Sequence, residues 1–164
     1  SPILYYGDEI GMGDNLNLPD RHGVRTPMQW DDSLHGGFTT GVPFTEMVQG
    51  DYHYQKVNVA DQMKSQHSLL RTIQRMIVIR KSHAALSGDM QWVETGNSAM
   101  LAYVRKNAEE AILVLSNLSS RVQVAQIPAE YQKSGQDLCE NRAYALNEKL
   151  TLQPYSYLWI KLSS

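Results

Sequence analysis

After Gly88, polar and apolar residues alternate with a period of two, and this pattern constrains the fold more than any other feature of the chain. It predicts β-strands, because successive side chains of a strand point to opposite sides. Turn residues separate the segments at roughly ten-residue spacing, which is typical of antiparallel sandwiches. We therefore expect a mostly β fold that ends in an antiparallel β-sandwich. The six expected strands are residues 90–94, 100–105, 111–116, 122–127, 150–152 and 155–162.

A helical pattern comes before these strands. In residues 65–86, apolar residues recur at three- and four-residue spacing, with arginine, lysine and glutamine between them. This spacing predicts one amphipathic helix. Ser65 or Ser68 can accept an amide hydrogen bond at its start, and Gly88 can close it. The change of period near residue 88 predicts a domain boundary there.

The part before the helix reads as a long loop. Residues 3–6 form a short β-branched and aromatic run that predicts a strand, and glycine, asparagine, aspartate and proline recur throughout residues 7–60. Irregular segments longer than about 15 residues are uncommon in compact domains unless they have a function. The chain opens with Ser1-Pro2 and enters the apolar run at once, so we expect it to be cut from a longer protein.

Composition excludes several classes of partner. The formal net charge is -2 and the 15 lysines and arginines are spread along the chain, which argues against nucleic acid. No apolar run approaches the roughly 18 residues that a membrane helix needs, so no membrane partner is expected. Cys139 is the only cysteine, which rules out an intrachain disulfide and favours a reducing compartment, the cytoplasm. Oligomerisation is left open.

Two motifs stand in the loop region, P-I-L-Y-Y-G-D-E-I-G at residues 2–11 and R-T-P-M-Q-W-D at residues 25–31. In this order they resemble the last barrel strand and the following loop of the α-amylase superfamily, glycoside hydrolase family 13. Shorter stretches at residues 11–15, 52–59 and 80–83 resemble its trehalose synthase branch. The resemblance is dense up to about residue 88 and is fragmentary beyond it.

The resemblance implies a division into two domains. Residues 1–88 would be the C-terminal end of a (β/α)8 catalytic barrel of the TIM type: its eighth strand, the long loop and the closing helix. Residues 89–164 would be the β-sandwich usually called domain C. The reading from the residues alone, a strand, a loop, a helix and then a sandwich, agrees with this division.

The resemblance also implies a chemistry. The parent enzyme would interconvert maltose and trehalose by intramolecular transglucosylation, acting on an α-linked glucose disaccharide or oligosaccharide. In this family the catalytic carboxylates follow the fourth, fifth and seventh barrel strands, upstream of Ser1, so the chain would contain no catalytic residue and be inactive alone. An α-glucosidase or α-amylase of the same superfamily is the alternative, and Pro19, His53 and Leu86-Ser87 depart from the branch pattern. A stand-alone sandwich that binds glycans or protein is a further alternative.

Two arginines of the loop are the candidates for substrate or lid contact, Arg21 and Arg25. Guanidinium groups suit sugar hydroxyls and acidic lid partners, and the resemblance places arginines of this loop near the second sugar. A salt bridge that pins the loop is the alternative for both. Five further residues are expected to form loop scaffold near the active site: Tyr6, Asp8, Glu9, Asp20 and Gln29. A catalytic role for the adjacent Asp8 and Glu9 is disfavoured, because neighbouring side chains on an extended segment point apart.

No metal or other cofactor is predicted. The oxygen-bearing residues Asp14, Asn15, Asn17 and Asp20 lack the twelve-residue loop pattern of a calcium site, and the five histidines show no paired spacing. A structural calcium ion in the parent protein is left open. The aromatic residues of the sandwich are expected to be core rather than a sugar-stacking face. They are Trp92, Tyr103, Tyr155, Tyr157 and Trp159.

Overall fold

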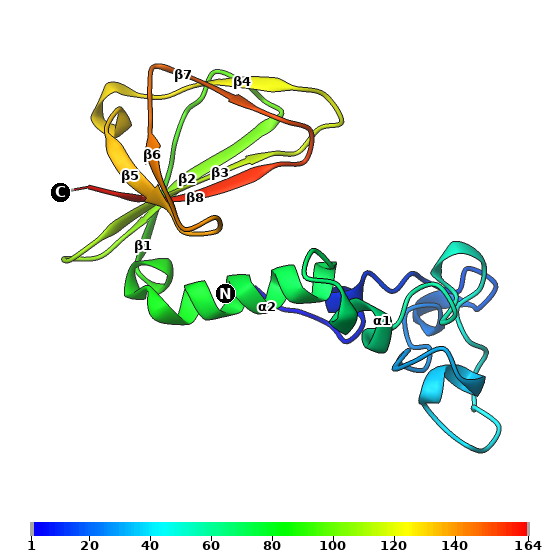
Figure 1. Cartoon of the computed structure of the whole chain (residues 1–164). Coiled ribbons are helices and arrows are strands. Elements are labelled where there is room, and N and C mark those ends of the chain that lie inside the picture. The colour runs from blue at the N-terminus through cyan, green and yellow to red at the C-terminus, as the bar shows by residue number, and fades with distance from the viewer. Residues whose placement is uncertain (1, 164) are drawn as a thin grey trace. The chain divides into compact units, whose positions relative to one another are not determined.

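A computed structural model describes residues 2–163, and the chain divides into two compact units between Arg75 and Met76 (Figure 1). The first unit is mostly irregular, while the second carries the sheets. Each unit is described below by itself.

The first unit is built from short helical turns joined by loop. The 3-10 helices are η1 (Asp8–Ile10), η2 (Asp20–His22), η3 (Leu34–Gly37) and η4 (Gly50–Tyr52). The α-helix α1 (Val59–Lys64) follows, and then α2 (Leu69–Ser82) begins. A small apolar cluster of Ile10, Met28 and Leu70 ties the start of the loop, its middle and α2 together. The loop is therefore folded on its own core rather than extended.

The strand expected at residues 3–6 is not formed. The structure assigns no strand to these residues, and the side chains of Ile3 and Leu4 are 92% and 54% exposed. A strand is held by hydrogen bonds to a neighbouring strand, and no strand of the described residues lies beside this segment. The apolar run consists of β-forming residues, but the described chain offers no strand with which it pairs.

The predicted helix over residues 65–86 is shorter than expected. Helix α2 begins at Leu69, where the Oγ atom of Ser68 accepts a hydrogen bond from the Arg71 amide at 3.2 Å. It ends at Ser82 and is followed by the 3-10 helix η5 (Ala84–Ser87). Of the two serines expected at the helix start, Ser68 is the one that caps it.

Helix α1 was missed by the sequence analysis, which placed its first residues in the loop. The Oδ1 atom of Asn58 accepts a hydrogen bond from the backbone amide of Asp61 at 2.8 Å, and the side-chain Nδ2 of Asn58 donates to the Asp61 carboxylate at 2.9 Å. The first bond satisfies a backbone donor at the helix start, and the second holds the capping side chain in place. The helix has only six residues, too few for its apolar period to be recognised.

The second unit is the predicted antiparallel β-sandwich, which is confirmed. One sheet has the strand order β1-β2-β3-β8-β5-β6 and the other pairs β4 with β7, all antiparallel. In Figure 1, β4 and β7 form a layer apart from the six-stranded sheet. The strands are β1 (Asp89–Trp92), β2 (Met100–Lys106), β3 (Ala111–Asn117), β4 (Gln123–Gln126), β5 (Ser134–Asp137), β6 (Arg142–Ala145), β7 (Lys149–Leu152) and β8 (Tyr157–Leu162), with the 3-10 helix η6 (Ala129–Tyr131) before β5.

The core lies between the two sheets. Alternate residues of β2 and β8 point into it, as their burial patterns show, and β3 is buried along most of its length. The side chains of Leu113, Leu115 and Ile160 are fully buried there. A second cluster on the opposite face of the large sheet contains Ala85 and Leu86 of η5. The helix that leads into the sandwich therefore ends packed on its outer face.

A charged group anchors η5 to β3. The carboxylate of Glu110 accepts hydrogen bonds from the Ala85 amide at 3.2 Å and pairs with Nδ1 of His83 at 2.9 Å. Its Oε2 atom also lies 3.2 Å from Nζ of Lys161 on β8. Burial raises the pKa of Glu110, but these hydrogen bonds outweigh burial and hold the pKa below its usual value.

This lowered pKa predicts that the second unit loses stability in acid. A carboxyl whose pKa is lower in the folded state stabilises the fold above its unfolded pKa of about 4.3, and this contribution is lost as the pH falls through the lowered value. We expect the free energy of unfolding to fall as the pH drops below about 5, and Glu110→Gln to flatten this part of the profile. Denaturant titrations across this pH range measure it. Glu109→Gln, at the exposed neighbour, is the matched control and should leave the profile unchanged.

Candidate functional site

The loop of the first unit is held in shape by Gln29, whose side chain is fully buried. Its amide Nε2 donates to the carbonyl oxygens of Tyr52 at 3.0 Å and of Val57 at 2.6 Å. The backbone carbonyl of Gln29 accepts from the Val59 amide at 3.0 Å. One side chain thus joins the middle of the loop to its end across more than twenty residues.

The two adjacent acids Asp8 and Glu9 serve the turn that carries them. Oδ2 of Asp8 accepts from the Tyr5 amide at 2.9 Å, and Oε2 of Glu9 accepts from the Gly7 amide at 2.8 Å. Gly7 lies at a φ of 94°, a region that favours glycine. Each carboxylate therefore has one oxygen engaged by local backbone.

Beside this turn lies a pocket of about 380 Å³ that brings together three of the predicted residues: Tyr6, Glu9 and Arg25. The Tyr6 hydroxyl donates to the Thr26 carbonyl at 2.9 Å, so the first motif and the second motif are joined directly. Burial and a hydrogen bond with Tyr5 raise the pKa of Tyr6, although nearby Arg25 opposes the rise. The other lining residues are Thr26, Pro27, Met28, Trp30, Phe38 and Phe44.

The lining of this pocket contains one cationic side chain, that of Arg25, and one anionic side chain, that of Glu9, among mainly apolar residues. A guanidinium group donates hydrogen bonds and a carboxylate accepts them, while aromatic rings can contact the C–H faces of a sugar. The lining thus offers the hydrogen-bond donors, the acceptors and the apolar surface that a neutral polyhydroxylated ligand needs. The pocket holds a single carboxylate, that of Glu9, whereas cleavage of a glycosidic bond with retention requires two about 5 Å apart.

Arg21 and Asp20 do not line this pocket. They lie on η2, where Nε of Arg21 is 3.9 Å from Oδ2 of Asp20 and both side chains are largely exposed. An exposed pair of this kind contributes little to stability. Asp8 also stays outside the pocket, and Gln29 is buried. The structure therefore groups Arg25 with Tyr6 and Glu9 and separates it from the other predicted residues.

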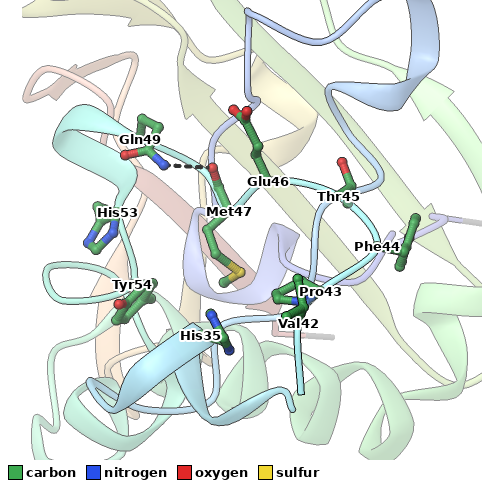
Figure 2. Close-up of a pocket in the computed structure, with 10 residues that line it drawn as sticks. All are labelled: His35, Val42, Pro43, Phe44, Thr45, Glu46, Met47, Gln49, His53 and Tyr54. Atoms are coloured by element: carbon green, nitrogen blue, oxygen red, sulfur yellow. Dashed lines mark hydrogen bonds between the residues drawn. The ribbon is translucent and has the colours of Figure 1, made fainter. Parts of the chain in front are cut away.

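A second pocket, of about 450 Å³, opens further along the loop (Figure 2). His35, His53 and Tyr54 lie together on one part of its wall, and the His53 and Tyr54 rings are 4.0 Å apart between centroids. His35 has a φ of 58° and a buried Nδ1 atom without a hydrogen-bond partner. Glu46 is the single carboxylate of this pocket, so it too lacks a pair. The sequence analysis found no paired spacing among the histidines and therefore singled out neither of these two as a site residue.

Of the four oxygen-bearing residues considered for calcium, Asn15 is tied into the loop by hydrogen bonds. The side chain of Asn15 is used by the loop itself: Nδ2 donates to the Met47 carbonyl at 3.1 Å and Oδ1 accepts from the Asn17 amide at 3.1 Å. Across residues 2–163, no group of three or more histidines, cysteines, aspartates or glutamates is arranged to hold a metal ion.

The aromatic residues expected in the sandwich core are divided in the structure. Tyr103 and Trp159 pack partly buried against the outer cluster of the large sheet. Trp92 and Tyr155 are instead 64% and 68% exposed, so the core prediction is wrong for these two. Trp92 stands on β1 at the edge of the sheet, and Tyr155 lies in the turn before β8 with a φ of 54°. Edge and turn positions leave a side chain without a covering layer.

Two family models together match nearly the whole chain. The model described as Alpha amylase, catalytic domain, matches residues 1–89, and the model described as Maltogenic Amylase, C-terminal domain, matches residues 90–159. No helix of the described part of the chain is long and apolar enough to cross a membrane.

Curated relatives include trehalose synthases and glucosidases. The chain is 41% identical over 137 residues to the trehalose synthase of Thermus thermophilus, a match that covers 79% of this chain and 14% of that protein. It is 34% identical to the trehalose synthase/amylase of Mycolicibacterium smegmatis, covering 99% of this chain and 31% of the relative. An oligo-1,6-glucosidase of Bacillus cereus is 29% identical, covering 98% and 29%. The chain thus spans less than a third of the length of these relatives.

Among solved structures, the trehalulose synthase of Pseudomonas mesoacidophila MX-45 is similar to this chain. The TM-score is 0.75 at 28% identity, and the match covers 88% of this chain and 26% of the other. An E254Q mutant of the same trehalulose synthase, with similar scores, was solved in complex with its substrate sucrose. The similarity therefore extends over both units of the chain.

Proposed function

We propose, on the premise that this chain belongs to the α-amylase family, that it is the C-terminal part of an enzyme that interconverts maltose and trehalose. In such a reaction the enzyme cleaves maltose to a bound glucosyl intermediate and rejoins the two glucose units before either escapes. The step needs a closed pocket from which water is excluded.

Sequence identity favours the trehalose synthase reaction over the glucosidase reaction. Identity to trehalose synthases reaches 41–43% over 127–137 residues, whereas identity to oligo-1,6-glucosidases is 29–32% over 164–165 residues. An α-glucosidase that releases glucose is the second candidate, supported by those glucosidase matches and by the shared chemistry of the two reactions up to the glucosyl intermediate.

The chain's own contribution in this proposal is to position and enclose the substrate rather than to cleave it. The cleaving carboxylates would belong to the remainder of the barrel. Arg25, with Tyr6 and Glu9 beside it, would contact the departing glucose or a lid segment through its guanidinium group. Arg21 is proposed for a lid contact only, because it stands outside this pocket.

The domain boundary belongs to the same proposal. We place the end of the barrel at residues 1–88 and domain C at residues 89–164. The two family models meet between residues 89 and 90, which supports this boundary, while the compact units divide earlier, within α2. A reducing, cytoplasmic setting is also proposed, because Cys139 is the only cysteine of the chain.

The test is product analysis with the complete enzyme that contains this chain. Maltose should give trehalose as the main product, with free glucose as the minor one, as followed by anomeric proton NMR. If glucose is the only product and trehalose is neither formed nor consumed, the enzyme is an α-glucosidase and the isomerase proposal is wrong.

A further inference from the structure

An exposed tryptophan lines the pocket that also holds Arg25 and Glu9. Trp30 stands near the end of the second motif, and it is 50% exposed although the four residues before it are buried. The residue belongs to the lining of the pocket of about 380 Å³. Tryptophan carries one of the largest apolar surfaces of any side chain, so a half-open indole beside a pocket favours a binding role over packing.

The backbone of Trp30 is fixed on both sides. Its amide donates to the Gly36 carbonyl at 2.8 Å, and its carbonyl accepts from the Ala60 amide at 2.9 Å. The preceding residue, Gln29, is the buried side chain that joins the middle of the loop to its end. The indole is therefore anchored to the folded core of the loop while half of its surface stays open. A group that is held in place before a ligand arrives loses little freedom on binding.

The two phenylalanines of the same pocket are held less firmly. Phe44 is 84% exposed, and no backbone hydrogen bond among residues 2–163 involves it. Phe38 is 44% exposed, and its amide donates to the His35 carbonyl at 3.1 Å. Ordering a ring that is not already fixed costs conformational entropy when a ligand binds. Of the three exposed aromatic residues in this pocket, Trp30 is thus the one best suited to serve as a rigid surface.

A pyranose sugar fits this combination of groups. Its ring has apolar C–H faces and a rim of hydroxyl groups, so it needs an aromatic surface together with hydrogen-bond donors and acceptors at the side. The Arg25 guanidinium group supplies donors and the Glu9 carboxylate supplies acceptors in the pocket that Trp30 lines. A purely apolar ligand would cover these two charges without pairing them, which is costly.

We infer that the indole ring of Trp30 is the surface on which the departing glucose of maltose stacks, while Arg25 and Glu9 bind its hydroxyl groups. This inference rests on the proposed function, which supplies the glucose, and it adds the residue that holds the sugar by its C–H face. The indole takes no part in making or breaking a bond. A glucose held in this way keeps its position while the glucosyl intermediate forms, so it is ready to rejoin.

The test measures initial rates of maltose consumption by the complete enzyme. In Trp30→Ala the KM for maltose should rise about tenfold while kcat changes by less than about threefold, because the lost contact binds substrate and transition state alike. Trp30→Phe keeps an aromatic face and should recover most of the loss. Trp30→Leu keeps apolar bulk without that face and should resemble Trp30→Ala. Trp92→Ala is the matched control and should leave KM unchanged, because Trp92 is 64% exposed but stands on β1 and lines neither loop pocket.

Three results would overturn the inference. They are an unchanged KM in Trp30→Ala, an equal recovery by Trp30→Leu and Trp30→Phe, which would indicate packing, and an equal rise of KM in Trp92→Ala. The outcome is separate from that of the proposed reaction, because KM is taken from the loss of maltose whichever product forms. A raised KM with glucose as the only product would support the role of Trp30 and reject the isomerase. An unchanged KM with trehalose as the product would do the reverse.

Discussion

Maltose incubated with the purified 164-residue chain is expected to stay maltose, with neither glucose nor trehalose formed above the uncatalysed rate. Retaining glycoside chemistry needs a nucleophilic carboxylate and a carboxylic acid about 5 Å apart. The two loop pockets described above hold one carboxylate each, Glu9 and Glu46. Asp8 and Glu9 each use one oxygen to hold their own turn. Compared with a complete enzyme, the rate of maltose conversion should be lower by the whole catalytic rate enhancement, about 10⁶-fold or more.

Contaminating amylases are the main source of error in this measurement. A matched variant distinguishes their activity from activity of the chain itself. The double substitution Glu9→Gln and Glu46→Gln removes the carboxylate from both pockets while keeping their shapes. Activity from a contaminant would be equal in both preparations. Activity that belongs to the chain would fall in the variant, and that result would contradict the proposal that the cleaving groups lie elsewhere.

The sandwich was predictable because its strands carry their own pattern. Buried and less buried residues alternate along the whole of β8 and along β2 up to Arg105. All six expected strands are present within a few residues of their predicted ends. Strands β5 and β6 were missed. Their sequences, S-G-Q-D and R-A-Y-A, contain no β-branched and no large aliphatic residue, and the one fully buried side chain is the charged Asp137. Neighbouring β8 pairs with β5, and this pairing, rather than hydrophobicity, places the strand.

The loop could be recognised from its motifs, but its internal arrangement could not be derived from them. The contact between Tyr6 and Thr26 joins residues twenty positions apart through turns at Gly7 and Gly11 that have no period. The same long-range folding separates Arg21 from Arg25, although they are only four residues apart. A local sequence pattern does not contain this information. The capping pair Asn58 and Asp61 is the exception, because its spacing is a local indication of helix α1 that the sequence analysis did not use.

In the complete enzyme, Arg25→Ala is expected to raise the ratio of free glucose to trehalose more than it lowers glycosidic cleavage. Arg25 lines a pocket with Tyr6 and Glu9 and is not one of the proposed cleaving carboxylates. Loss of one charge-assisted hydrogen bond to the departing glucose or a lid costs about 1.5–3 kcal/mol. The glucosyl intermediate can either rejoin the departing glucose or react with water. A free-energy change of this size alters the ratio of these two rates by about 10- to 150-fold. Glucose and trehalose released from maltose are measured together by NMR.

The neighbouring arginine provides the control for this experiment. Arg21 is largely exposed, 3.9 Å from Asp20 and outside the pocket, so Arg21→Ala should change the product ratio far less. Arg25→Lys keeps the charge but not the planar fork of donors, and an intermediate ratio would indicate that the geometry of the guanidinium group matters. If Arg25→Ala lowers total turnover or thermal stability at an unchanged ratio, Arg25 is a structural tie of the loop. If Arg21→Ala raises the ratio of free glucose to trehalose more than Arg25→Ala does, the pocket beside Tyr6 is not the place where the departing glucose is held.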